Sequence, residues 1–309
     1  MTPHGFNRLA ALAYLALLIG LVVARREPPE EAALPEPITA LPENSAVVLT
    51  VDLERLRATE LGRQLLSQSS DTALPAAAGC QSLLQRADRL AGAMPRLEHA
   101  EDLGVLGVAF SGRFERSEIQ GCVRRSLEER GLAPSIEQES GFTWFGSTEE
   151  HAGALALRDD GLLLGAPRSY LHSMIAAANR VAPNVRKSDQ HRLLRELVGV
   201  NGTLLLSAVW DMPWFPGVRA AALRADFSPR LRVELALRCD DELRCAALAA
   251  RLRGLEDEPM LKLAGLALPR GSLQVEDLDG LVRGSLDVQV SEARPLLRQA
   301  FALLYAPGR

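Results

Sequence analysis

Three segments of the chain alternate hydrophobic and polar residues around a short turn, and each is followed by a helix-like pattern. They cover residues 152–165, 219–238 and 272–290. In the second segment, Val233 and Leu235 alternate with charged neighbours. A period of two predicts a strand with one buried face and one face in water. The three segments therefore predict β-hairpins of an antiparallel sheet.

Turn residues lie within these hairpins, and residues typical of helix starts follow them. The turns read DDG at 159–161, FSP at 227–229 and LDG at 278–280. Asp-Gly between alternating strands favours a tight hairpin. Asp241 and Ser291 stand where helices are expected to begin, and their side chains supply acceptors for the unpaired N–H groups of a first helical turn.

The repeated hairpin-plus-helix unit sets the expected fold class. A sheet with one apolar face must bury that face, and the helix after each hairpin is suited to cover it. We therefore expect an α+β fold of antiparallel sheets with helices on one face. The fold is expected in two related halves, at 43–200 and 201–309, after one N-terminal hydrophobic helix.

The first half carries further predicted elements. Residues 46–51 form a β-branched apolar run that predicts a strand, and Asp52 is placed to cap a helix after it. The apolar spacing predicts helices near 80–93 and 114–130, with a buried strand at 103–110 between them.

Residues 9–24, LAALAYLALLIGLVVA, contain no charge. A helix of this length spans about 24 Å, slightly less than a hydrocarbon core of about 30 Å. Three interpretations compete: a signal peptide cleaved after Ala24, an uncleaved transmembrane anchor, and a buried core helix. The run has no polar face, which disfavours the core helix. We favour the anchor.

Charges near this run bear on its orientation. One basic residue precedes it, and Arg25 and Arg26 follow it, a count that by itself favours the opposite orientation. A short positive segment before a long folded region is nevertheless the common secretory arrangement, so we expect an extracytoplasmic body. Residues 25–42 hold five prolines and four glutamates, which predicts a semi-rigid tether.

Composition narrows the class of partner. Hydrophobic residues at 47% and charged residues at 24% are typical of a globular protein and argue against disorder. The net charge of −4 offers no general attraction to a phosphate backbone, so we expect no nucleic-acid partner. The expected contacts are the membrane, through residues 9–24, and a possible protein partner.

Four cysteines, Cys80, Cys122, Cys239 and Cys245, show neither a C-x-x-C pair nor zinc spacing. An even number in an exported chain allows two disulfides, and four buried free thiols are the alternative in a reducing compartment. We favour Cys80–Cys122 and Cys239–Cys245, because each pair lies within one half of the chain.

No sequence motif of a known catalytic or nucleotide-binding site occurs. His99 stands beside acidic residues and His172 lies on a predicted helix, and each is better explained as a loop or packing residue than as an acid–base catalyst. We expect no metal, no cofactor and no enzymatic activity. A hydrolase built on either histidine is the disfavoured alternative.

One segment is rich in aromatic residues. Trp210, Trp214 and Phe215 fall within six positions of a connection broken by two prolines. If exposed, they predict a rigid aromatic anchor for a binding partner. The alternative, which we favour, is a loop folded back to fill a core that is poor in aromatic residues.

The chain resembles uncharacterised extracytoplasmic proteins of myxobacteria and related bacteria, which carry an N-terminal anchor or lipoprotein signal and duplicated α+β domains of unknown function. The likeness is carried by residues 41–66 (LPENSAVVLTVDLERLRATELGRQLL), 107–127 (GVAFSGRFERSEIQGCVRRSL) and 156–174 (ALRDDGLLLGAPRSYLHSM). It implies a periplasmic location and this fold type. The chain lacks the lipobox cysteine of the lipoprotein members.

Two functions fit these features. The first is a membrane-tethered, non-catalytic interaction or scaffold protein in the periplasm. The second is a carrier that binds lipid or peptide in a groove between helices and sheet, for which Met174, Ile175 and Trp214 are candidate lining residues.

Overall fold

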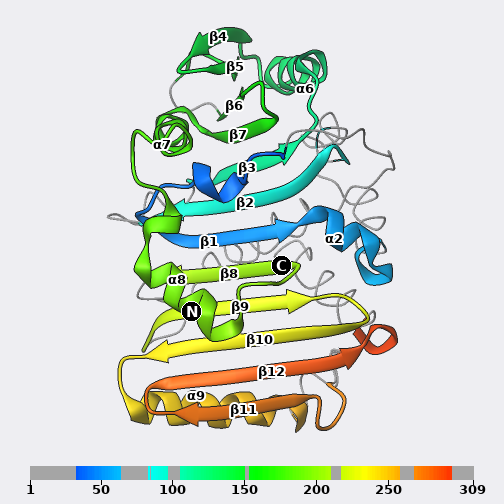
Figure 1. Ribbon diagram of the computed structural model, residues 1–309, viewed down its shortest axis with the longest axis vertical. Helices are drawn as coiled ribbons and strands as arrows, with labels where there is room; N and C mark the ends of the chain where they lie inside the picture. Colours follow the sequence, from blue (N-terminus) through cyan, green and yellow to red (C-terminus); the bar gives the residue numbers. More distant parts are fainter. Residues whose placement is uncertain are drawn as a thin grey trace.

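Every strand of the described residues belongs to one antiparallel sheet (Figure 1). The computed structural model describes residues 33–63, 83, 85–96, 105–149, 153–209, 217–257 and 268–293. The sheet has twelve strands in the order β11-β12-β10-β9-β8-β1-β2-β3-β7-β6-β5-β4. The strands are β1 (Ser45–Asp52), β2 (Ala87–Pro95), β3 (Gly107–Gly112), β4 (Ser135–Glu139), β5 (Phe142–Gly146), β6 (Gly153–Leu157), β7 (Leu162–Pro167), β8 (Leu204–Val209), β9 (Val218–Asp226), β10 (Arg230–Cys239), β11 (Leu273–Leu278) and β12 (Leu281–Gln289).

The helices precede the first strand or lie in connections between strands, several of which join strands that are not neighbours in the sheet. They are η1 (Pro37–Ala40), α2 (Leu53–Ala58), α6 (Arg116–Glu128), α7 (Arg168–Ala178), η3 (Val185–Lys187), α8 (Asp189–Val198), α9 (Glu242–Arg253) and η4 (Gly254–Asp257). The α7–α8 connection, for example, joins β7 to β8, which lie on opposite sides of β1, β2 and β3.

Strand β1 shows why both faces of the sheet are covered. Val48 is completely buried on one face, and Val51 is 3% exposed on the other. A strand with apolar side chains on both faces must lie inside a sheet that is packed on both sides. β1 accordingly pairs with β2 on one edge and β8 on the other.

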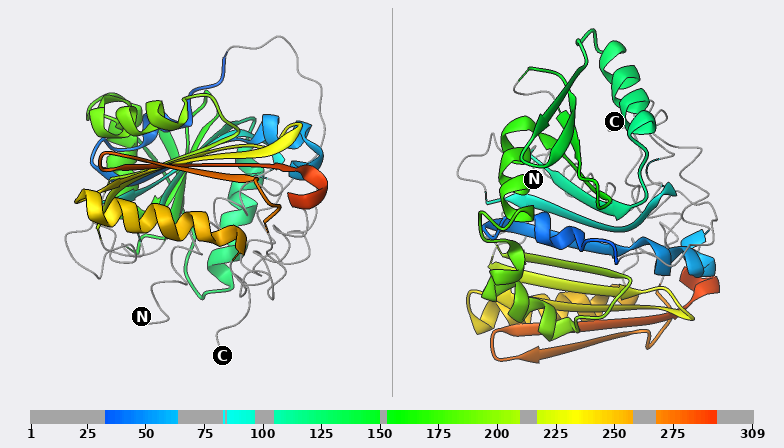
Figure 2. Two further views of the ribbon diagram at one scale, coloured as in Figure 1. Left: turned by 90° about the horizontal axis from the view of Figure 1, so that it is seen from below. Right: turned by 45° about the horizontal axis from the view of Figure 1, so that its top comes forward.

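The first face, called the α7 face below, carries η1, α7 and α8. Leu171 and Met174 of α7 pack against Ala91 and Leu164 of the sheet, and all four residues are completely buried. Small alanine side chains let the helix approach the strands closely. Figure 2 shows α7 and α8 on the same side of the sheet.

The opposite face, called the α6 face, carries α6 and α9. Ile119 of α6 is completely buried against a cluster that includes Leu90 and Leu163 of the sheet. Cys245 and Ala249 of α9 pack on the same face of the sheet, against Val282 of strand β12. Figure 2 shows both helices on the side opposite α7 and α8.

The expected α+β fold with helices on one face and two related halves is wrong. The structure has a single continuous sheet, joined through the β1–β8 ladder, and helices on both of its faces. Seven strands come from residues before 200 and five from residues after it, so the halves are unequal. Local patterning identified hairpins correctly but contained no information on whether they shared one sheet.

One element was assigned the wrong type. Residues 87–93 fall in the predicted helix near 80–93, but they belong to strand β2. The sequence ADRLAGAMP lacks β-branched residues, so its intrinsic preference is helical. Hydrogen bonding to β1 and β3 on both sides overrides that preference.

The N-terminal predictions lie mostly outside the described residues, and these include residues 9–24. Within the described part of the chain, no helix has both the length and the apolar composition needed to cross a bilayer. The end of the predicted tether is packed: Ala40 and Leu41 are completely buried beneath α7. Packing against the sheet thus begins within the proline-rich segment.

Candidate functional site

An open groove of about 380 Å³ lies between α6 and the sheet. Its floor is formed by strands β3, β6 and β7, and its roof by the second half of α6. The volume falls within the range of about 300–1,000 Å³ that ligand pockets occupy. The floor residues that face α6 are Leu106, Val108, Gly153, Leu155, Gly165 and Pro167.

Two glycines explain why the floor is hollow. Gly153 lies opposite Pro167, and Gly165 lies opposite Leu155, in the β6–β7 ladder. Cross-strand partners share a face of the sheet, so each pair has one missing side chain beneath the helix. A Cβ built on Gly153 meets no atom within 4 Å, whereas one on Gly165 lies 2.9 Å from the Leu155 side chain. The open space therefore lies over Gly153.

Helix α6 forms the roof through residues at helical spacing. Cys122, Val123, Ser126 and Leu127 line the groove, and Cys122 and Leu127 are buried. Cys122 is disulfide-bonded, and its predicted partner, Cys80, lies outside the described residues. The burial of Cys122 and Leu127 shows that this side of the helix packs against the body of the protein.

The polar groups of the groove lie at one end. Ser126 and Arg130 both line it, four residues apart. Arg130 lies two residues beyond the end of α6 in an exposed turn, where its backbone N–H donates to the Leu127 carbonyl at 3.0 Å. The groove is therefore apolar along its floor and cationic at its rim.

The lining residues expected from the sequence do not form this groove. Met174 is completely buried and Ile175 is 4% exposed, both in the solid core between α7 and the sheet. Trp214 lies outside the described residues, as do Trp210 and Phe215 of the same aromatic segment. The alternation of β6 and β7 could have indicated the hollow, because glycines stand at inward positions of both strands.

His191 forms a buried serine–histidine pair that the sequence did not single out. Its Nε2 lies 2.8 Å from the Ser45 carbonyl and its Nδ1 lies 2.8 Å from the Ser207 hydroxyl. A carbonyl only accepts, so Nε2 carries the hydrogen and Nδ1 accepts from Ser207. Burial lowers the pKa of His191, and the nearby Arg195 and Arg96 lower it further, while the Ser45 carbonyl opposes this shift.

This pair has the contacts of a nucleophile and its base, but it is sealed. Ser207 has no exposed surface and His191 is 2% exposed. A substrate atom cannot reach the hydroxyl in this conformation. The pair instead fixes α8 to strands β1 and β8.

Arg195 lies beside this pair without an acidic partner in the described structure. Its Nε donates to the Ser207 hydroxyl at 3.4 Å, and its Nη2 is buried without a hydrogen-bond partner. Burial lowers the pKa of Arg195 to about 10, and Arg186 contributes to the same direction. The guanidinium remains charged near neutral pH, and the removal of this charge from water destabilises the folded state.

His172 lies at the surface beside Glu139, where the separation of Nδ1 and Oε1 is 3.8 Å. That is longer than the hydrogen bond a general acid–base pair requires, about 2.6–3.2 Å. The ring instead lies tilted against Trp144, with an interplanar angle of 46° and centroids 4.8 Å apart. Arg168 lies over the same indole and pairs with Glu137. His99 lies outside the described residues.

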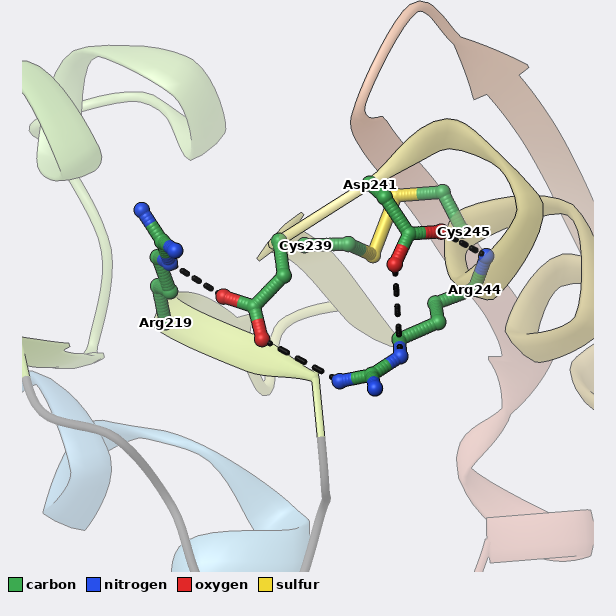
Figure 3. The surroundings of a disulfide bond; sticks show 6 residues. Arg219, Cys239, Asp241, Arg244 and Cys245 are labelled. Carbon is green, nitrogen blue, oxygen red and sulfur yellow. Dashed lines mark hydrogen bonds and ion pairs between the residues drawn. A yellow bond between two sulfur atoms is a disulfide. The ribbon is translucent and has the colours of Figure 1, made fainter.

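The structure joins Cys239 to Cys245, with their Cα atoms 5.6 Å apart (Figure 3). The bond links the end of β10 to the start of α9. Asp241 caps the helix by accepting from the Arg244 backbone N–H at 2.8 Å. Arg219 and Arg244 approach the neighbouring Asp240 from two sides, which neutralises its charge.

Metal-ligating side chains do not gather in groups of three or more anywhere in the described ranges. The absence of a metal or cofactor site remains a prediction from the sequence. No family model, curated protein or solved structure matches the chain. The likeness to anchored myxobacterial proteins therefore also remains a prediction.

Proposed function

We propose that the chain is a membrane-tethered, periplasmic binding module without catalytic chemistry of its own, and that the groove beneath α6 holds an apolar ligand. The observation that carries this proposal is the groove itself, with an apolar floor and polar groups confined to one end. Small-molecule sites have this composition, because apolar burial supplies affinity and a few polar groups supply orientation.

The surroundings favour a preformed site. The floor belongs to the interior of the sheet, where β7 pairs with β3 on one edge and β6 on the other. The roof packs against the body through the buried residues Ile119 and Leu127. A rigid site loses little conformational entropy on binding.

Binding of a neutral apolar ligand tests the proposal. The full chain, held in lipid nanodiscs, is dialysed to equilibrium against decanol, and empty nanodiscs give the uptake by lipid. We expect saturable binding of one decanol per chain. Gly153→Leu fills the space over the floor, so we expect it to weaken binding at least fivefold.

Two further variants complete the design. Ser126→Phe fills the groove from the roof and should give the same loss. Gly121→Leu adds the same side chain to α6 outside the groove, where a Cβ meets no atom within 4 Å, so binding should persist. Unfolding curves for each variant check that the fold is retained. Equal binding by wild type and Gly153→Leu would refute the groove as the site.

The tether is tested independently by fractionation. We expect the full chain in the membrane fraction and a chain lacking residues 1–24 in the soluble periplasmic or cytosolic fraction. Recovery of the full-length chain in the cytosol would contradict the proposed location and leave the groove unaffected.

A further inference from the structure

We propose that the ligand of the α6 groove is a medium-chain aliphatic carboxylate, with its chain over the Gly153 floor and its carboxylate at Arg130. This inference rests on the proposed function and adds the chemical class of the ligand.

Arg130 is the charged residue of the groove lining. Within the described residues its side chain has no ion pair, whereas Arg124 of α6 lies 3.9 Å from Glu128. Glu128 and Glu129 precede Arg130 in the chain, but neither lines the groove. The rim therefore presents a cation that the protein itself does not neutralise.

Ser126 adds a second donor on the same side of the roof. Ser126 lies in the last turn of α6 and Arg130 in the turn that follows the helix, and both line the groove. A guanidinium presents two parallel N–H groups that match the two oxygens of a carboxylate. One such cation balances one negative charge, which favours a carboxylate over a doubly charged phosphate monoester.

The remaining lining sets the other end of the ligand. Val108, Val123, Leu127 and Leu155 offer only aliphatic surface, so the part of the ligand distant from Arg130 is a hydrocarbon. The groove volume of about 380 Å³ lies at the lower end of the range for small-ligand sites, about 300–1,000 Å³. A medium chain of about ten carbons is therefore a suitable probe of the site.

The head group is tested with three ligands that share one chain length: decanoate, decanol and decyltrimethylammonium. Each is dialysed against the full chain in nanodiscs at low salt, with empty nanodiscs subtracted. We expect decanoate to bind three- to tenfold more tightly than decanol, a modest factor because Arg130 is exposed. Decyltrimethylammonium should bind most weakly.

Arg130→Gln should remove the preference for decanoate and leave decanol binding unchanged. The matched control is Arg251→Gln, which removes an exposed arginine from the last turn of α9 and should alter neither. The preference should also shrink as salt screens the charges.

The outcomes separate the two proposals. The carboxylate assignment is overturned if decanoate and decanol bind with equal affinity, or if the preference for decanoate persists in Arg130→Gln. In either case, a fivefold loss of decanol binding in Gly153→Leu would still support the groove as the site. If no ligand binds wild type more tightly than Gly153→Leu, both proposals fall.

Discussion

The Nδ1 of His191 accepts a hydrogen bond from the Ser207 hydroxyl at 2.8 Å, in a site where both residues are buried. The two residues join α8 to the middle of the sheet, and the Ser45 carbonyl holds the other side of the ring. This contact makes the anchorage of α8 sensitive to protonation, because a charged imidazole would have to donate from both nitrogens.

Acid should destabilise the protein through His191. Its folded-state pKa lies below the ordinary value, so the unfolded chain binds this proton more readily. The contribution of the neutral His191 ring to the free energy of unfolding is fully present above pH about 6.5. It is lost as the pH falls toward the lower folded-state pKa. We expect wild type to lose up to about 1.4 kcal/mol per pH unit in that window relative to His191→Gln.

Urea unfolding of both proteins between pH 5 and 8 measures this difference. Subtraction of the variant removes the contributions of the other titrating groups. A difference that stays constant across the range would show that the ring is not held neutral by its surroundings.

Replacement of Arg195 by methionine should stabilise the protein. The guanidinium is mostly buried and its Nη2 has no hydrogen-bond partner in the described structure. Methionine keeps much of the packing and removes the desolvated charge, so we expect a gain of roughly 1–3 kcal/mol. The control Arg192→Met breaks exposed ion pairs with Asp189 and Glu196, which solvent screens, so it should change stability little.

Chemical unfolding at pH 7 compares the two arginine variants. A loss of stability in Arg195→Met larger than that in Arg192→Met would mean that the buried guanidinium makes a net favourable contribution.

Gly107 should be required for the docking of α7. A Cβ at this position would lie 2.4 Å from Tyr170 Cε1 and 2.6 Å from Met174 Sδ, and both side chains are buried. Both side chains are packed in the core, so Gly107→Ala should cost about 1–3 kcal/mol. Gly153→Ala, which meets no atom within 4 Å, should change stability by less than about 0.5 kcal/mol. Thermal unfolding of Gly107→Ala and Gly153→Ala, each compared with wild type, measures the two effects. A loss confined to Gly107→Ala would come from close packing and not from glycine replacement in general.

Loss of the Cys239–Cys245 disulfide should cost about 2 kcal/mol, near the lower end of the usual range, because the bond closes a loop with a sequence separation of only 6. The double alanine variant, compared with wild type under oxidising conditions, measures this cost. Mass spectrometry of protein taken from the cell envelope should find the bond intact. A fully reduced pair would argue against an oxidising compartment.

The groove shows where pattern reading succeeded and where it stopped. Helical spacing placed Cys122, Val123 and Leu127 on one side of the predicted helix at 114–130, and the structure puts that side over the sheet. Nothing in the spacing indicated which strands lie beneath it. Gly153 and Gly165 belong to the groove floor because β7 pairs with β3 and so completes the surface that faces α6.

The buried polar contacts of His191 could not be predicted from the sequence for a similar reason. His191 is separated from the Ser45 carbonyl by 146 positions, and its neighbours in sequence give it the pattern of an ordinary amphipathic helix residue. Contacts at that range depend on the sheet order, which local periodicity does not contain.

By itself the sequence determined the three predicted hairpins and most helices, because these depend on turn chemistry and on residues a few positions apart. It favoured the pairing of Cys239 with Cys245 but left the other connectivities open. The tertiary structure alone decided that the hairpins form one sheet, that helices cover both of its faces, and that a groove lies beneath α6. The physical reason is that strand order is set by the combined burial of two faces along the whole sheet, a quantity to which each segment contributes only a part.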